Sequence, residues 1–244
     1  MASPALRFLY TKVQTVLRER FNLVLERRHP GLGEQEGRFP YQSKWIDFGL
    51  KGDERVLDVG SGRHPFPHAT HLLDRYSGAT SHRTGKLVID RPTIIGAIEK
   101  LPFADKSFDF VYCSHVLEHV EDPAQACEEL MRVGLRGYIE TPAKISDVML
   151  NFTRIENHHR WHVNLVGNTL VFIEWDQRER RDLGSSHFYS ELHSPWQNPF
   201  QDFVHKNRDL FVNMMLWEHR FDYLVITQQG QIRQYSRLHR QGTS

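Results

Sequence analysis

The sequence predicts a doubly wound α/β fold, in which a mostly parallel sheet carries helices on both faces. Short apolar runs with the length of buried strands recur at residues 56–59, 72–74, 87–90, 108–112 and 136–142. A helix with clear start signals, beginning at Pro123, separates the last two runs. Strands and helices that alternate in this order are typical of parallel α/β sheets.

Composition narrows the class of protein. The 244 residues (28.7 kDa) suffice for one large domain, or for one domain with an extra lobe. The 31 Lys and Arg nearly balance 30 Asp and Glu, which argues against a protein that coats nucleic acid. No apolar run approaches the ~18 residues of a membrane helix. Cys113 and Cys127 cannot form a disulfide framework, so a cytoplasmic protein is expected and secreted, fibrous and membrane-spanning classes are excluded.

The first 30 residues predict a basic amphipathic helix. Apolar residues such as Leu6, Leu9, Val13 and Val16 recur at spacings of three and four, and Pro30 ends the pattern. Six Lys or Arg against two Asp or Glu leave this segment with a charge of +4. We favour a helix packed on the body of the protein. Peripheral contact with an anionic membrane stays open, whereas the two acidic residues count against a transit peptide.

A candidate ligand site follows the first strand, where residues 56–59 lead directly into Gly60-Ser61-Gly62. Such a turn lets a ligand approach the backbone, and its amides can bind a carboxylate or a phosphate. Asp58 lies inside the strand, where packing alone explains a carboxylate poorly. Asp74 ends the second strand, twelve residues after Gly62, where a carboxylate can chelate two ribose hydroxyls. The alternative is a structural turn with a capping aspartate.

The predicted helix after residue 121 carries its own signals. Asp122 is the expected N-cap and Pro123 the first helical residue. An apolar stripe should face the core, with Glu128 and Glu129 facing water. The stripe consists of Ala124, Cys127, Leu130 and Met131.

Several motifs in one order carry a family resemblance. VLDVGSG, then Asp74, then EKLPFADKSFDFVYCSHVLEHVEDP and YIETP are similar to the class I S-adenosylmethionine-dependent methyltransferases, and within them to the methyltransferase type 11 group, over residues 45–142. The resemblance implies a Rossmann-like, seven-stranded sheet. Residues 168–175 and 221–228 would be its sixth and seventh strands, with an insertion between them. We expect an N-terminal helical extension at 1–40 and a methyltransferase domain at 41–244, with a substrate or lid region at about 143–220.

The resemblance also implies S-adenosylmethionine as the cofactor and a set of residues that bind it. Asp58, Gly60, Ser61 and Gly62 would hold its amino-acid half, and Asp74 its ribose. The turn of Ile98, Glu99 and Lys100 would pass along the adenine edge, and Ser114 and His115 would lie near the sulfonium and the acceptor. Many relatives have an aspartate where this chain has Ala97, so the contact to the adenine amino group must come from the backbone, from Glu99 or from water.

Histidines are the candidates for chemistry. Methyl transfer is an in-line displacement that requires positioning, and an acceptor hydroxyl or ammonium must lose a proton. Imidazole, with a pKa of ~6.5, suits that role. Two groups of histidines are catalytic candidates. The first histidine group is His115 and His119, and the second is His158 and His159. The alternatives are a His119 that merely packs, and solvated or structural histidines in the second group.

Trp161 and His162 are the candidate substrate contacts. His158 and His162, four residues apart, could bind zinc on a helix, but no third ligand is evident nearby, and no metal is expected. The aromatic residues farther on favour core packing; a lid, a dimer surface, or a pocket for a flat or cationic acceptor stay open. They are Phe188, Tyr189, Trp196, Phe200, Phe203, Phe211 and Trp217.

The sequence therefore predicts metal-independent methyl transfer to an oxygen or nitrogen of a small molecule or sugar, such as a natural product or glycan precursor. One alternative is a non-catalytic partner or sensor that binds the same cofactor. Another is an NAD-dependent oxidoreductase, which the missing third glycine after Gly62 and the early Asp74 disfavour. Nucleic-acid methylation is disfavoured by the near-neutral charge. A homodimer, the acceptor, and which histidine acts as the base are left open.

Overall fold

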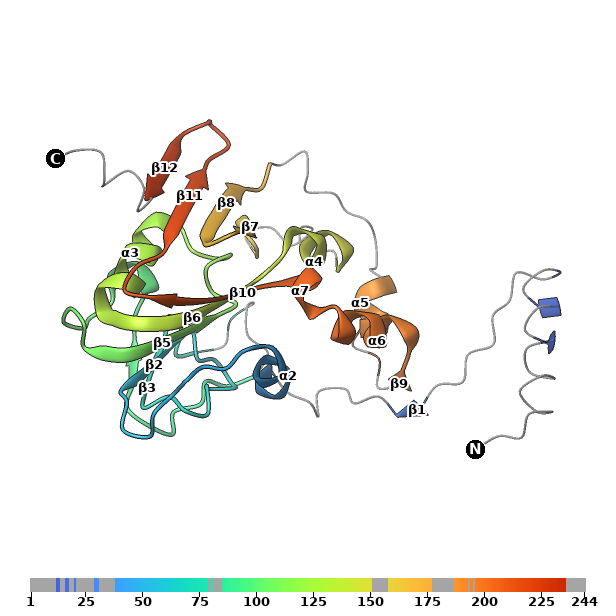
Figure 1. The fold of residues 1–244 in the computed structure, drawn as a ribbon, viewed down its shortest axis with the longest axis horizontal. Coiled ribbons are helices and arrows are strands. Elements are labelled where there is room, and N and C mark those ends of the chain that lie inside the picture. Colours follow the sequence, from blue (N-terminus) through green and yellow to red (C-terminus); the bar gives the residue numbers. More distant parts are fainter. Residues whose placement is uncertain are drawn as a thin grey trace.

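A six-stranded sheet is the centre of the fold (Figure 1). The computed structural model describes residues 12–13, 16–17, 20, 29–30, 38–78, 80, 85–150, 158–176, 187–192, 194 and 196–235. Most of the predicted N-terminal helix lies outside these residues. Its described positions from 12 to 20 are helical, with Val13 and Val16 exposed, whereas its last two residues, His29 and Pro30, form a short strand. Among the described residues, no helix has both the length and the apolar character needed to cross a bilayer.

The main sheet has the strand order β10-β6-β5-β2-β3-β4. Its strands are β2 (Val56–Val59), β3 (His71–Asp74), β4 (Thr93–Ile95), β5 (Phe108–Ser114), β6 (Gly134–Pro142) and β10 (Val212–Glu218). Strands β2 to β6 run parallel, and β10 pairs with β6 in the opposite direction. The carboxyl ends of β2, β3, β5 and β6 therefore meet at one edge, which is where open α/β sheets bind ligands.

A second sheet contains two strands that the sequence analysis assigned to the first. It has the order β12-β11-β8-β7, with strands β7 (Trp161–Val166), β8 (Thr169–Glu174), β11 (Asp222–Ile226) and β12 (Ile232–Tyr235). The predicted strands at 168–175 and 221–228 exist and pair in parallel, but with each other and away from β6. The main sheet thus has six strands among the described residues. Its edge is taken by β10, which the sequence analysis had placed in the substrate or lid region.

One further strand was misplaced by a few residues. Residues 87–90 form no strand, and β4 begins at Thr93. The amide of Val88 donates instead to the carbonyl of Gly62, 3.1 Å away, so this segment lies against the glycine turn. The chain joins the sheet only after Pro92, whose carbonyl accepts from the Leu72 amide.

Asn213 of β10 joins the two sheets. Its side-chain amide donates to the carbonyl of Val163 in β7 and to the hydroxyl of Thr141 in β6, at 2.8 and 3.0 Å. Its side-chain oxygen accepts from the Leu165 amide at 3.1 Å. A bridge between Ala143 and Val163 continues this junction. The second sheet is therefore held where β6 ends, beside the ligand-binding edge.

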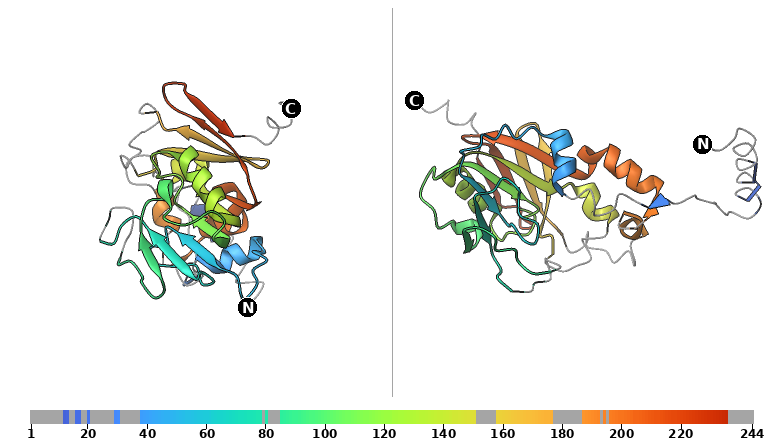
Figure 2. Two further views of the ribbon diagram at one scale, coloured as in Figure 1. Left: turned by 90° about the vertical axis from the view of Figure 1, so that its left-hand side faces the viewer. Right: turned by 90° about the horizontal axis from the view of Figure 1, so that it is seen from below.

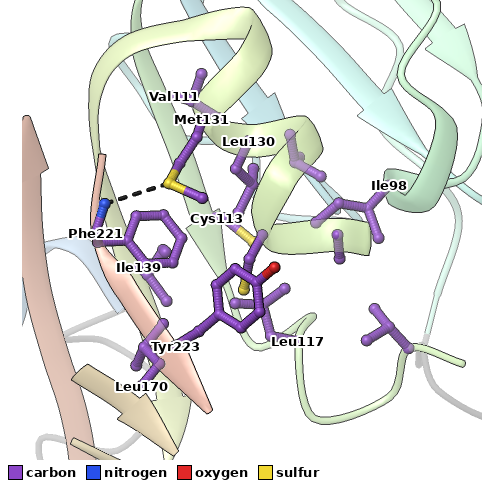
Figure 3. Packing of buried hydrophobic residues seen from close by; sticks show 14 of the residues in the cluster. Ile98, Val111, Cys113, Leu117, Leu130, Met131, Ile139, Leu170, Phe221 and Tyr223 are labelled. Atoms are coloured by element: carbon purple, nitrogen blue, oxygen red, sulfur yellow. Dashed lines mark hydrogen bonds between the residues drawn. The ribbon is translucent and has the colours of Figure 1, made fainter. Parts of the chain in front are cut away.

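Helix α3 (Pro123–Val133) packs against both sheets (Figure 3). Its apolar stripe is buried as expected, and Asp122 caps it by accepting from the Gln125 amide. The sulfur of Met131 accepts from the amide of Phe221, which leads into β11. The prediction for Glu129 was wrong, because this residue is buried, accepts from the Leu101 amide at 2.6 Å and pairs with Arg132.

The remaining helices gather beyond the carboxyl ends of the parallel strands (Figures 1 and 2). They are α2 (Arg38–Trp45), α4 (Lys144–Met149), α5 (His187–Leu192), α6 (Pro199–Lys206) and α7 (Arg208–Phe211). Near them, β1 (His29–Pro30) pairs with β9 (Trp196–Gln197). Of the aromatic residues that the sequence analysis noted here, Phe211 and Trp217 are buried, whereas Phe188, Tyr189, Trp196 and Phe203 are largely exposed. The 3-10 turn η2 (Ile98–Lys100) packs against α3.

Gly137 of β6 lets β10 pack onto the sheet. A Cβ atom at this position would lie 2.2 Å from the Val111 carbonyl oxygen and 2.8 Å from the Trp217 indole. We expect Gly137→Ala to lower the free energy of unfolding by about 2 to 3 kcal/mol, measured by urea denaturation. Gly52→Ala is the matched control, because a Cβ there meets nothing within 4 Å. Equal stability of the two variants would contradict the packing of Trp217 on Gly137.

Candidate active site

A cavity of about 560 Å³ opens at the carboxyl edge of the main sheet. Residues after β2, β3 and β5 line one half of it, which we call the cofactor half. The other half, the acceptor half, is lined by residues of α4, α7 and the loops around the second histidine group, and by Leu192 and Val204 of α5 and α6. The volume of the whole cavity is in the range of small-molecule sites.

The glycine turn forms the floor of the cofactor half. Gly60 and Gly62 have φ angles of 78° and 57°, and a Cβ on Gly60 would lie 2.3 Å from a methyl group of Val116. The amides of Gly60 and Ser61 both donate to the Leu73 carbonyl, and the Gly62 amide donates to Asp74. The sequence suggested that these amides could bind a ligand, but all three already donate within the protein. The turn presents bare Cα atoms and the buried hydroxyl of Ser61, which has no hydrogen-bond partner among the described residues.

The two aspartates of this region differ in position. Asp74 lines the cavity, and its carboxylate accepts from the amides of Gly62 and Tyr76 at 3.0 and 2.9 Å. Asp58 is buried and does not line the cavity; its carboxylate accepts from the Phe66 amide at 2.7 Å. Asp58 thus holds the loop after the glycine turn, and a direct cofactor contact has no support in the geometry.

The expected adenine edge is partly in place. Gly96, Ile98 and Glu99 line the cavity, whereas Ala97 and Lys100 do not. The Glu99 carboxylate accepts from the Glu121 amide at 3.1 Å, which fixes the side chain at the rim. Ile98 therefore adds an apolar surface and Glu99 a carboxylate to the wall of the cofactor half.

His115 stands at the boundary of the two halves, directly after β5. Its Nε2 lies 2.9 Å from the Glu140 carboxylate, and its Nδ1 lies 3.5 Å from that of Glu118. Its φ angle of 56° is in the left-handed region, so the chain turns sharply here. Burial lowers the pKa of His115, but the hydrogen bonds and charges of the two carboxylates outweigh it and raise the pKa. This favours the protonated ring, which cannot accept a proton from a substrate.

Glu140 of β6 is the anchor beneath His115. It is fully buried, and its carboxylate accepts hydrogen bonds from α2, from β5 and the loop after it, and from β6 itself. The donors are Tyr41, Gln42, Ser114, His115 and Tyr138. Burial raises the pKa of Glu140, but these donors and the charge of His115 lower it to about 2. The carboxylate therefore stays charged and ties α2 to the site.

Protonation of Glu140 at low pH should weaken the hydrogen bonds that its carboxylate accepts. The pKa of Glu140 is depressed in the folded state, so its contribution to stability is complete above the unfolded value of ~4.3 and is lost as the pH falls toward 2. The titratable groups around it, Tyr41, Tyr138 and His115, stay protonated throughout this window. We expect the melting temperature of the protein to fall between about pH 5 and pH 2 more steeply than that of Glu140→Gln. Parallel curves for the two proteins would contradict this.

The second histidine group meets the loop after β5. His158 and His159 line the acceptor half together with His119, whose Nδ1 hydrogen bonds to the carbonyl of His158. The Nδ1 atom of His159 lies 2.6 Å from the carboxylate of buried Asp147 in α4. All four histidines that the sequence analysis nominated as catalytic, including His115, thus lie on one cavity.

Trp161 and His162 do not line this cavity. Trp161 is in the core and donates to the Val120 carbonyl at 2.8 Å, and His162 packs on Trp175. The reason is that Trp161 begins strand β7, so a helical spacing of His158 and His162 does not arise. A substrate contact by either residue, and a zinc pair of His158 with His162, have no support in the geometry.

Four functional candidates were absent from the sequence analysis. Glu118, Glu140 and Asp147 are buried carboxylates, and Arg208 lines the acceptor half with its guanidinium over the Tyr41 ring, 3.9 Å from the centroid. The signal that singled out Asp58, an acid inside an apolar strand, was also present for Glu140. Nothing in the sequence marked Arg208 or Asp147, because their role depends on where α7 and α4 pack.

The fold and cavity together define a class of protein: a Rossmann-like α/β domain with a cofactor-sized site at the carboxyl edge of its sheet. Residues 68–137, which run from before β3 into β6, match the family model described as "Methyltransferase domain". This match covers the middle of the chain, including Asp74 and His115, and indicates a methyltransferase domain there.

Relatives match parts of the chain. A demethylmenaquinone methyltransferase of Renibacterium salmoninarum is 39% identical over 88 residues, covering 33% of this chain and 36% of the relative. An uncharacterized methyltransferase of Schizosaccharomyces pombe is 34% identical over 103 residues, covering 34% of this chain and 37% of the relative. The chain thus spans about a third of the length of the curated relatives that it matches.

Solved structures with a similar fold cover more of the chain. A Haloferax volcanii methyltransferase in complex with the Trm112 activator is 15% identical, covers 76% of this chain and 92% of its own, and has a TM-score of 0.43. The MccD protein is 14% identical, covers 75% of this chain and 97% of its own, and has a TM-score of 0.41.

Proposed function

We propose that the protein transfers the methyl group of S-adenosylmethionine to an oxygen or nitrogen of a small molecule or sugar. The observation that carries this proposal is the single cavity that joins Ser61 and Asp74 to a chamber of histidines and carboxylates. Ser61, whose buried hydroxyl has no partner among the residues that the structure describes, and Asp74, whose carboxylate lies on the wall, fit the amino-acid and ribose parts of the cofactor. Ile98 and Glu99 would face its adenine.

The bound cofactor supplies an electrophilic methyl group on a positively charged sulfur. In the transfer, a lone pair of the acceptor would replace sulfur on the methyl carbon, and the electron pair of the carbon–sulfur bond would leave with S-adenosylhomocysteine. The protein has to align the acceptor with the methyl group and take up the acceptor's proton. His115, held by Glu118 and Glu140, would set the boundary between cofactor and acceptor.

The acceptor half suits a small polar molecule. It combines the histidines with Arg208, whose Nε has no hydrogen-bond partner among the described residues. Phe211 and Leu150 add apolar surface. Arg208 would pair with an acceptor that carries a carboxylate or phosphate, such as an acidic sugar.

Calorimetric titration of the purified protein with S-adenosylmethionine tests the cofactor, and titration with NADH tests the nicotinamide alternative. We expect saturable binding of S-adenosylmethionine and none of NADH. Release of S-adenosylhomocysteine on adding sugars and small hydroxyl or amino compounds then tests transfer. Binding of NADH in place of S-adenosylmethionine would overturn the proposal, and cofactor binding without transfer to any acceptor would favour a sensor or partner role.

A further inference from the structure

Three side chains of the kinds that bind transition metals converge in the acceptor half. The ligand atoms of Glu118, His119 and His159 all lie within 4.8 Å of one another, and all three residues line the cavity. They come from two segments some forty residues apart. The amides of Arg160 and Trp161 both donate to the Glu118 carbonyl, at 2.8 and 3.1 Å, so the backbone clamps the two segments together.

The Glu118 carboxylate is unsatisfied in this arrangement. It is 1% exposed, and neither of its oxygens accepts a hydrogen bond from any described residue. Its nearest cationic candidates are the nitrogens of His115 and His119, at 3.5 and 3.7 Å, beyond good hydrogen-bond geometry. The ion pair with protonated His115 offsets part of the cost of burying this carboxylate, and a bound cation would offset more.

The two histidines are oriented as metal-binding histidines are. The carbonyl of His158 can only accept, so the proton of a neutral His119 ring lies on Nδ1 and the lone pair on Nε2. The carboxylate of Asp147, 2.6 Å from Nδ1 of His159, has the same effect on that ring. A ligand histidine typically donates its other nitrogen to a carbonyl or carboxylate in this way. The Nε2 atom of His119 lies 3.7 Å from the Glu118 carboxylate, so the two groups could bind one ion.

We propose that Glu118, His119 and His159 bind one divalent transition-metal ion, with Asp147 and the His158 carbonyl as the outer groups that orient the histidines. Two imidazoles and a carboxylate are typical of Zn²⁺ sites that keep a fourth position open, and nitrogen ligands disfavour Mg²⁺. Tetrahedral ligands of Zn²⁺ lie about 3.3 Å apart, so binding would draw these side chains together by roughly 1 Å. No metal was expected from the sequence because His158 and His162 had no third ligand nearby; the set proposed here instead combines His159 with two residues about forty positions earlier.

The open position would face the acceptor half of the cavity. A heteroatom of the acceptor bound there would be held near the methyl group and would lose its proton more readily. This role rests on the proposed function, whereas binding of the ion does not.

The test uses the full chain after treatment with a chelator. Calorimetric titration with Zn²⁺ should show one ion per chain, and Co²⁺ should give the visible absorption of a four- or five-coordinate site. We expect Glu118→Gln and His159→Gln to weaken binding by at least about 100-fold, and Asp147→Asn by roughly 10- to 100-fold. His158→Gln is the matched control, because it removes a neighbouring imidazole and keeps the carbonyl that orients His119; its affinity should stay within about threefold of the wild type.

Thermal unfolding adds a readout that needs no substrate. Without metal, Glu118→Gln should melt close to the wild type, because it removes both a buried charge and its ion pair with His115. Zn²⁺ should raise the melting temperature of the wild type and leave that of Glu118→Gln unchanged. Absence of saturable Zn²⁺ and Co²⁺ binding to the wild type, or equal binding by Glu118→Gln, would overturn the proposal. S-adenosylmethionine titrated into the metal-free protein shows separately whether the methyltransferase function stands.

Discussion

Asp74→Ala should weaken S-adenosylmethionine binding by about 100-fold. The carboxylate lies on the cavity wall at the carboxyl end of β3, where it would accept hydrogen bonds from both ribose hydroxyls. Each hydrogen bond to a charged group contributes about 1.5 kcal/mol, so losing two costs about 3 kcal/mol of binding free energy. Calorimetric titration of wild type and variant with the cofactor measures the difference.

Two further variants separate the loss of a cofactor contact from a disturbance of the glycine turn. Asp74 also accepts from the amides of Gly62 and Tyr76, so its removal could disturb the glycine turn. Asp74→Asn keeps the size of the side chain and one acceptor oxygen, and we expect an intermediate loss of about 10-fold. Asp53→Ala, at an exposed position away from the cavity, should bind like the wild type. An affinity of Asp74→Ala within threefold of the control would remove Asp74 from the cofactor site.

Glu140→Ala should lower the free energy of unfolding by about 3 to 5 kcal/mol. The substitution leaves the buried hydroxyl of Tyr138 and the amide of Gln42 without their acceptor, and it strips His115 of its closest carboxylate. Glu140→Gln keeps the shape and half of the acceptors, and should cost about 1 to 3 kcal/mol. Urea denaturation followed by circular dichroism gives both values.

Glu218→Gln is the matched control for this series. Glu218 lies on the neighbouring strand β10, its side chain is 75% exposed, and its ion-pair contact is with His219 at 3.7 Å. Its substitution should change stability by less than about 0.5 kcal/mol. If Glu140→Ala were as mild as the control, Glu140 could not be the group that ties α2 to the floor of the site.

Local signals predicted much of the parallel part of the fold. The apolar runs at β2, β3, β5 and β6 lie close to their predicted ranges, and Asp122 and Pro123 begin α3 as expected. These features depend on neighbours within a few residues, so a single sequence contains them. The third run was misplaced because Val88 satisfies its amide on the glycine turn and β4 forms only after Pro92.

Strand partners were predicted less well. The runs at β8 and β11 were identified as strands, but the choice between the main sheet and a second sheet is not a local property. Gly137 admits Trp217 of β10 at the edge of β6, and Asn213 bonds to both sheets. These contacts join residues fifty or more positions apart, and the contact at Gly137 also depends on a space that only the packed sheet creates.

The sequence by itself determined the class of fold, the family resemblance, the glycine turn with Asp74, and the histidines that line the cavity, because each is a pattern of neighbouring residues. The tertiary structure alone decided which groups those histidines meet. It placed His115 between Glu118 and Glu140, brought His159 to His119 and Asp147, and moved Trp161 and His162 away from the cavity. Charge, hydrogen bonding and burial at a site are sums over residues distant along the chain, and folding is what brings those residues together.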